Sequence, residues 1–285
     1  MAASAATRLR KMLTASDIVV APGAYDGLSA KMIEEAGFAA VYCTGGGISR
    51  SRGQPDLGYT TLTELVERIG SMTETCPLPM IVDADSGFGG VLNLRRAVRA
   101  LERVDAAAVH IEDLEVPNRR RQAKDNLVEP KEMEARLRAA LGARQNPDFL
   151  VIGRTDVLPM LGLPAAIERT LRFAGAGADM VYIDGIKTRA QMEELGRKVN
   201  APKLIGIIAG ECEQVPAADL AQMGFKLLTI PADPQLAAIH AVRRLLAHIK
   251  NNGSSAGIDA LCTFEERDAL VDTHRHREIE HEYLP

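Results

Sequence analysis

The chain is organised around the residues Met80-Ile81-Val82-Asp83-Ala84-Asp85-Ser86-Gly87-Phe88-Gly89-Gly90. They begin as a short apolar run, which is typical of a strand buried on both faces, and end in two acids and a glycine-rich turn. Asp83 and Asp85 are two residues apart, so on an extended strand their side chains would point the same way. Adjacent carboxylates repel each other unless a cation or proton intervenes, and Mg²⁺ takes one or two carboxylates while it keeps several waters. The alternative is that both acids only cap a helix that begins near Asn93.

Apolar segments that read as buried strands alternate with helical patterns along most of the chain. A single α/β barrel typically needs about 250 residues, so 285 residues suffice. The strands are expected at 18–22, 38–44, 79–85, 106–113, 149–156, 180–184, 203–208 and 225–231. This succession, without a break in composition, predicts a (β/α)₈ TIM barrel. A doubly wound sheet is the rival, but it would carry a glycine-rich phosphate fingerprint after its first strand, and residues 21–25 are not one.

The C-terminal part of the chain differs from the rest. Residues 251–257, Asn-Asn-Gly-Ser-Ser-Ala-Gly, read as a flexible hinge. Residues 258–285 are polar, charged and helical in pattern, so they cannot form a core alone. We therefore expect a catalytic barrel over residues 1–250 and a hinge with a helical tail over residues 251–285. The tail would pack on the barrel or on a neighbouring subunit.

Composition excludes several classes of function. The formal net charge of −4 gives no general attraction to nucleic acid. The cysteines lack the spacing of a zinc site or a disulfide framework, and they fit a reducing compartment. The N-terminus has no apolar core of a signal peptide, and no run approaches the roughly 20 apolar residues of a membrane span. We expect a cytoplasmic protein without a nucleic-acid or membrane partner.

The polar residues that follow the expected strands define a candidate site, because barrel enzymes carry their active sites at the carboxyl ends of the strands. These residues are Tyr25, Asp26, Thr44 to Gly47, Asp83, Asp85, Glu112, Arg154, Asp184 and Gly206 to Glu211. Acids at several strand ends beside an arginine suit an anionic substrate bridged by a divalent cation. The arginine could hold a carboxylate through two hydrogen bonds, and the metal could polarise a carbonyl and stabilise an enolate.

Several of these segments together resemble the isocitrate lyase and phosphoenolpyruvate mutase superfamily. The segments are Ala24-Tyr25-Asp26, Thr44-Gly45-Gly46, Pro55-Asp56-Leu57-Gly58, Asp83-Ala84-Asp85-Ser86-Gly87-Phe88-Gly89, His110-Ile111-Glu112-Asp113 and Gly153-Arg154-Thr155-Asp156. The resemblance covers about residues 8–250. It is strongest to the branch of 2-methylisocitrate lyase and carboxyphosphonoenolpyruvate mutase.

The resemblance implies a barrel that assembles as a homotetramer, a dimer of dimers in which C-terminal helices swap between subunits. It implies Mg²⁺, with Mn²⁺ as an alternative, held directly by Asp85 and largely through water by Asp83, Asp56 and Glu112. It also implies residues that hold the carboxylate and oxo group of a small substrate: Tyr25, Thr44, Gly45, Gly46 and Arg154. Further substrate contacts would come from Asp83, Asp184 and Gly206. Tyr25, Glu112 and Arg154 are the implied catalytic residues.

The sequence also departs from the lyases of this superfamily. Their mobile lid after the fourth strand carries a Cys-Gly-His motif whose cysteine is the catalytic acid, whereas residues 117–122 here are Pro-Asn-Arg-Arg-Arg-Gln. Arg120 and Arg121 are the candidates for closing over an anionic substrate, and the alternative is an ordinary solvated loop. Asp184 replaces the expected glutamate, and Gly206 replaces the expected asparagine. Cys43 and Cys212 are interpreted as ordinary buried cysteines.

These features predict a Mg²⁺-dependent lyase that cleaves a carbon–carbon bond of a small 2-oxo or 2-hydroxy di- or tricarboxylate through an enolate. Both 2-methylisocitrate lyase chemistry and oxaloacetate decarboxylation fit. The alternative among enzymes is phosphonate or phosphoenolpyruvate mutase or hydrolase chemistry. A further alternative is a barrel that has lost catalysis and binds a carboxylate metabolite, which the missing lid cysteine favours and the retained acids oppose.

Overall fold

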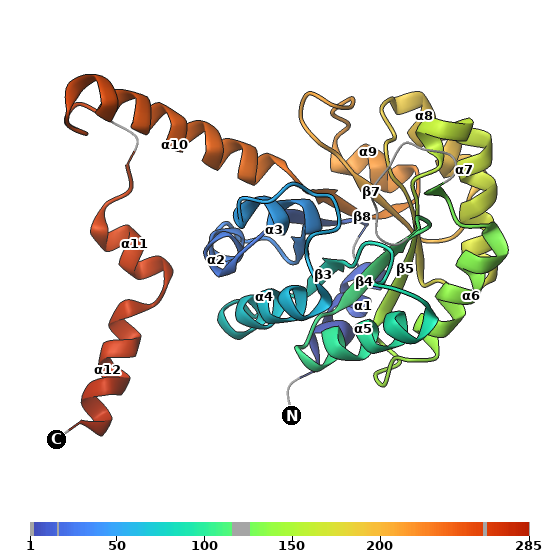
Figure 1. The fold of residues 1–285 in the computed structure, drawn as a ribbon, viewed down its shortest axis with the longest axis horizontal. Helices are drawn as coiled ribbons and strands as arrows, with labels where there is room; N and C mark the ends of the chain where they lie inside the picture. The colour runs from blue at the N-terminus through green and yellow to red at the C-terminus, as the bar shows by residue number, and fades with distance from the viewer. Residues whose placement is uncertain (1–2, 16, 116–125, 259–260, 285) are drawn as a thin grey trace.

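The computed structural model describes residues 3–15, 17–115, 126–258 and 261–284. Parallel strands pair in sequence order and close into a barrel, because β8 returns to pair with β1 (Figure 1). The strands are β1 (Val19–Ala24), β2 (Val41–Cys43), β3 (Met80–Asp83), β4 (Ala108–Glu112), β5 (Leu150–Thr155), β6 (Met180–Ile183), β7 (Lys203–Gly206) and β8 (Phe225–Ile230). The predicted (β/α)₈ barrel is confirmed.

Helices alternate with these strands and surround the barrel, as Figure 1 shows. They are α1 (Ala5–Ala15), α2 (Gly27–Glu35), α3 (Gly45–Ser51), α4 (Leu62–Thr75), α5 (Val91–Arg103), α6 (Pro130–Leu141), α7 (Leu158–Gly175), α8 (Arg189–Lys198), α9 (Ala217–Gln222), α10 (Asp233–Asn252), α11 (Phe264–Leu270) and α12 (Thr273–Tyr283). Capping boxes fix where several of them begin. In α4, for example, Thr61 accepts from the Glu64 amide while the Glu64 side chain accepts from the Thr61 amide.

The alternation of side chains along each strand divides the apolar residues between two cores. On β3, Met80 and Val82 belong to the core between the barrel and its helices, whereas Ile81 belongs to the core inside the barrel. Asp83 has the same parity as Ile81. On β3, apolar residues therefore fill the barrel first, and a polar residue faces inward at the carboxyl end.

The opposite end of the barrel is covered by α1. Its side chains of Leu9 and Leu13 are buried in the core inside the barrel, together with Val19 of β1 and Leu227 of β8. Arg10 ties this helix to the loops below β5 and β6 by ion pairs with Asp148 and Asp179. A ligand therefore approaches the barrel interior from the carboxyl ends of the strands.

Two local expectations differ from the structure. The strand expected to continue to Asp85 ends at Asp83, and Asp85 adopts a left-handed backbone with φ of 45°. The strand expected to run to residue 44 ends at Cys43, and Gly45 directly begins the short helix α3, because the Thr44 hydroxyl accepts a hydrogen bond from the Gly47 amide and caps it.

The helices at the C-terminus leave the barrel. Helix α10 has no buried side chain, and Figure 1 shows α10, α11 and α12 extending away from the barrel. A left-handed Gly253 with φ of 67° ends α10, and the tail returns toward α2, where Lys31 and Asp272 form an ion pair of 3.1 Å. Within the described ranges, no helix combines the length and the apolar character needed to cross a membrane.

Candidate active site

The position of the site follows from the alternation of side chains along the strands, described above. Asp83 ends β3, Glu112 ends β4, Arg154 lies near the end of β5, and Asp184 directly follows β6. Register places Asp83 beside His110, and Glu112 beside Arg154. Because all four face the interior at the same end, the closed sheet brings together side chains that lie as far apart in the sequence as Asp83 and Asp184.

Arg154 is the centre of this cluster and is only 3% exposed. Its Nε and Nη2 atoms each donate a hydrogen bond of 2.7 Å to the Asp156 carboxylate. Its guanidinium also lies 3.1 Å from Asp184, 3.6 Å from Glu112 and 3.9 Å from Asp83. Burial alone would lower the pKa of Arg154, but Asp156, Asp184 and Glu112 raise it well above its usual value. One permanent positive charge thus faces four carboxylates.

A buried network fixes the position of Asp156 behind Arg154. The Asp113 carboxylate, which is fully buried, accepts hydrogen bonds from the Thr155 hydroxyl at 2.6 Å and from the Asp156 amide at 2.9 Å. Arg169 of α7 pairs with the same carboxylate at 2.8 Å and also donates to the Val128 carbonyl. The orientation of Arg154 therefore depends on a helix on the outside of the barrel.

The two acids of the organising segment have different surroundings. Asp83 is 6% exposed, and its Oδ1 accepts a hydrogen bond of 3.1 Å from the Asp85 amide. The Asp85 carbonyl in turn accepts from the Glu112 amide at 2.9 Å. Because Asp85 lies beyond the strand in a left-handed conformation, the argument from strand alternation does not apply to it. The loop that follows also has positive φ at Gly87, Phe88 and Gly89, so the glycines serve a tight turn.

Tyr42 contributes a buried hydroxyl to the same end of the barrel. This hydroxyl shares a hydrogen bond of 2.7 Å with Nε2 of His110, and the two rings stack with centroids 5.7 Å apart. Nε2 of His110 also lies 3.6 Å from Asp83. Burial, and then Asp83, raise the pKa of Tyr42 well above its usual value, so the phenol stays protonated at neutral pH.

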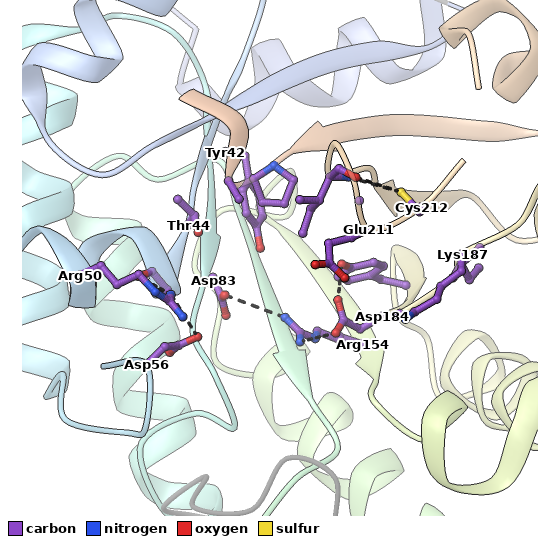
Figure 2. A pocket seen from close by; sticks show the side chains of 18 residues that line it. Tyr42, Thr44, Arg50, Asp56, Asp83, Arg154, Asp184, Lys187, Glu211 and Cys212 are labelled. Carbon is purple, nitrogen blue, oxygen red and sulfur yellow. Dashed lines mark hydrogen bonds and ion pairs between the residues drawn. The ribbon is translucent and has the colours of Figure 1, made fainter. Parts of the chain in front are cut away.

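A pocket of about 370 Å³ opens above this cluster (Figure 2). Most of the predicted substrate and metal residues that the structure describes line it: Thr44, Gly46, Asp56, Asp83, Arg154, Asp184 and Gly206. Gly45 lies just behind the lining, and a Cβ atom there would come within 3.1 Å of the Asp83 carboxylate. The closed barrel thus brings the predicted site residues of β2, β3, β5, β6 and β7 to one cavity.

Three other predicted residues lie apart from the described lining, and two lie outside the described residues. Tyr25 is partly buried against the core between barrel and helices and is not among the described lining residues, so its contact with the substrate stays a prediction. Asp85 and Glu112 lie beside the pocket floor and are linked to each other through the backbone. Arg120 and Arg121 fall in the segment 116–125, which the structure does not describe.

Tyr42 and Tyr182 are among the pocket residues that sequence reasoning missed. Each lies two positions before a residue that was predicted, Thr44 and Asp184. The alternation of side chains could therefore have predicted both tyrosines, because residues two apart on a strand share a face. Cys43, the last residue of β2, is fully buried in the core between the barrel and its helices. Burial raises the pKa of its thiol, which agrees with its interpretation as a core residue. Cys212 is half-buried and lines the pocket.

The donor set fits a magnesium ion better than a metal with a closed protein cage. Within the described residues, no three His, Cys, Asp or Glu side chains converge as a ready-made metal cage. Mg²⁺ needs fewer, because it usually keeps several waters and is bound through one or two carboxylates. The cluster around Arg154, with Asp83 and Glu112 at adjacent strand ends, offers that set.

Fold and site together define an α/β-barrel enzyme with an anionic, oxygen-rich pocket at the carboxyl ends of its strands. A family model described as phosphoenolpyruvate phosphomutase matches residues 9–250. The chain belongs to this family, within the isocitrate lyase and phosphoenolpyruvate mutase superfamily, as the sequence motifs predicted.

Named relatives cover nearly the whole chain. A 2,3-dimethylmalate lyase from Eubacterium barkeri is 35% identical over 98% of both chains. A 2-methylisocitrate lyase from Bacillus subtilis is 34% identical over 94% of this chain and 88% of the relative. An oxaloacetate decarboxylase from Rhodopseudomonas palustris is 35% identical over 92% of this chain and 91% of the relative. The predicted class, an enzyme that cleaves carbon–carbon bonds, is confirmed, and the phosphonate alternative is not favoured.

A solved structure supplies a ligand-bound comparison. A phosphonopyruvate hydrolase in complex with oxalate and Mg²⁺ superimposes with a TM-score of 0.91, at 28% identity, over 99% of this chain and 100% of that chain. The shared barrel is therefore one that, in that protein, holds a small dicarboxylate together with magnesium.

The substitution Arg169→Met tests the support behind Arg154. It keeps the side-chain length but leaves the buried Asp113 carboxylate without this cation, so the free energy of unfolding should fall by roughly 3–5 kcal/mol. Urea denaturation measures this loss. Arg172→Met on the same helix is the matched control, because Arg172 pairs with Glu134 at the surface and should cost about 0–1 kcal/mol. Equal losses in the two variants would contradict the proposed network.

Proposed function

We propose that this lyase is magnesium-dependent and acts on a small 2-oxo or 2-hydroxy carboxylate through an enolate. The observation that carries the proposal is the gathering of four carboxylates around the buried guanidinium of Arg154 at the pocket floor. A divalent cation would bind beside these carboxylates, and an anionic substrate would then bind against the cation.

The residues that would hold the ion are Asp85 directly and Asp83, Asp56 and Glu112 largely through water. A bound Mg²⁺, or Mn²⁺ in its place, would polarise the 2-oxo group of the substrate as a Lewis acid. The oxalate and Mg²⁺ named for the phosphonopyruvate hydrolase structure support this assignment.

The side chains of the pocket suit the remaining tasks. The Thr44 hydroxyl accepts from the Gly47 amide and so can direct its own proton to a substrate carboxylate. Gly45 and Gly46 would add backbone amides, and Arg154 would fix the oxo group or carboxylate from the floor. Arg120 and Arg121, outside the described residues, are proposed to close over the substrate.

Tyr42, which lines the pocket, is proposed as a proton-carrying residue in addition to Tyr25, the implied catalytic residue. In cleavage of a 2-hydroxy acid, the substrate hydroxyl passes its proton to water as the carbonyl forms. The electrons of the broken carbon–carbon bond pass to the carbon beside a carboxylate and give an enolate, which then takes up a proton. His110, hydrogen-bonded to the Tyr42 hydroxyl, can relay this proton.

Release of pyruvate from oxaloacetate and from 2-methylisocitrate, assayed in parallel with Mg²⁺ present, tests the proposed function. We expect turnover of at least one of them, its loss on addition of EDTA, and its recovery with excess Mg²⁺. Asp83→Asn should lower kcat/KM on the order of 10–100-fold, by weakening the hydration shell of the ion. Glu193→Gln, on the exposed face of α8, is the control and should have no effect. Turnover that resists EDTA would reject the magnesium requirement.

We also propose a cytoplasmic homotetramer, a dimer of dimers in which the tail, residues 251–285, lies on a neighbouring barrel. The support is the exposed apolar surface of α10, where Leu236, Val242 and Leu246 are 52%, 53% and 59% exposed. A monomer rarely leaves such a continuous apolar surface uncovered. The four cysteines are free thiols, which agrees with a reducing compartment.

Deletion of residues 255–285 tests the assembly. We expect the mass measured by light scattering to fall below that of the full chain, because the truncated chain lacks the segment that covers its neighbour. Leu246→Glu in the full chain should weaken the assembly in the same direction, because it puts a charge into the apolar surface of α10. An unchanged mass in both variants would count against the swapped tail.

A further inference from the structure

The pocket has two chemically different halves. Figure 2 shows Thr44, Arg50, Asp56 and Asp83 on one side, with Arg154 between them and the opposite side. The far half comes from the loops after β6, β7 and β8. Its lining includes apolar side chains and glycine, here called the distal subsite: Ile186, Gly206, Ile208, Cys212 and Pro231. The near half suits the metal and the reacting carboxylate, so the distal subsite faces the remainder of the substrate.

Tyr182 sets the depth of the distal subsite. Its hydroxyl donates a hydrogen bond of 2.7 Å to Asp184, and its ring lies under the Arg154 guanidinium at 5.4 Å. A Cβ atom on Gly206 would lie only 2.8 Å from this hydroxyl. Tyr182 is 6% exposed and cannot easily move aside. The phenol therefore occupies the space that a side chain at position 206 would need, and position 206 offers no polar group to a substrate.

The charges near the distal subsite oppose a further anionic group. Asp184 and Glu211 line this half of the pocket, and Lys187 is the cation that the described lining places beside them. Arg154 already faces four carboxylates, and both oxygens of Asp184 are engaged, one by Tyr182 and the other by Arg154. A substrate carboxylate here would meet like charges, whereas an alkyl group would meet Ile186 and Ile208.

We propose that the distal subsite binds an alkyl substituent, so that the preferred substrate is an alkyl-branched 2-hydroxy dicarboxylate and not a tricarboxylate. This inference rests on the proposed lyase function and adds the class of substrate. A filled apolar subsite contributes about 10-fold or more to kcat/KM for each methyl group that it accepts.

The experiment compares kcat/KM for 2,3-dimethylmalate, unbranched malate and 2-methylisocitrate, with Mg²⁺ present and cleavage followed by release of the oxo-acid product. We expect 2,3-dimethylmalate to exceed each of the other two by about 10-fold or more. Equal or better use of 2-methylisocitrate would overturn the subsite while leaving the lyase function intact. If none of the three substrates is turned over, the proposed subsite is rejected. If oxaloacetate is not turned over either, the proposed function is rejected as well.

A variant pair makes the test specific to the distal subsite. Ile208→Lys places a cation among the apolar side chains, so it should shift the ratio of kcat/KM values toward 2-methylisocitrate by about 10-fold or more. Ile208→Leu keeps the apolar character and should retain the preference for the alkyl-branched substrate. Thermal unfolding of both variants shows that each has folded. An unchanged ratio in a folded Ile208→Lys enzyme would place the substrate away from Ile208 and contradict the inference.

Discussion

The ionic cluster around Arg154 is the interaction on which the rest of the site depends. A guanidinium that is 3% exposed requires partners, and Asp156 accepts two hydrogen bonds from it. Asp156 is held by Asp113, and Asp113 by Arg169 from the outer layer of helices. The carboxylates beyond Asp156 then determine the chemistry, because carboxylates are ligands that suit a divalent cation. The same cluster that stabilises the barrel end thus favours a bound cation and an anionic ligand.

Much of the fold and of the candidate site could be predicted from the pattern of strands and helices in the sequence. Alternating buried strands and helices predicted the barrel, and residues at strand ends, such as Asp83, Glu112 and Arg154, predicted where the site lies. Asp85 did not follow the alternation, because its left-handed backbone takes it out of the strand. Tyr42 escaped prediction because it lies inside a strand, where an aromatic residue reads as core. Its polar role becomes visible only when the closed barrel brings His110 within 2.7 Å.

Other features of the site depend on pairs that no local pattern encodes. Gly206 reads as a missing contact in the sequence, but in the structure it leaves room for the Tyr182 hydroxyl from the neighbouring strand. Tyr182 on β6 and Gly206 on β7 fit each other in size across the two strands, so neither residue alone predicts the shape of the pocket. Burial and then Asp184 raise the pKa of Tyr182 well above its usual value, so its hydroxyl remains a donor to Asp184. The shape of the pocket is therefore a tertiary property.

Calorimetric titration of Mg²⁺ into the wild-type protein and into Asp85→Asn tests the central claim most directly. It measures whether the carboxylates around Arg154 bind a cation, independently of any substrate. The account predicts saturable binding to the wild type and a loss of affinity on the order of 10–100-fold in the variant. Equal affinities, or no Mg²⁺ binding by the wild type, would contradict it.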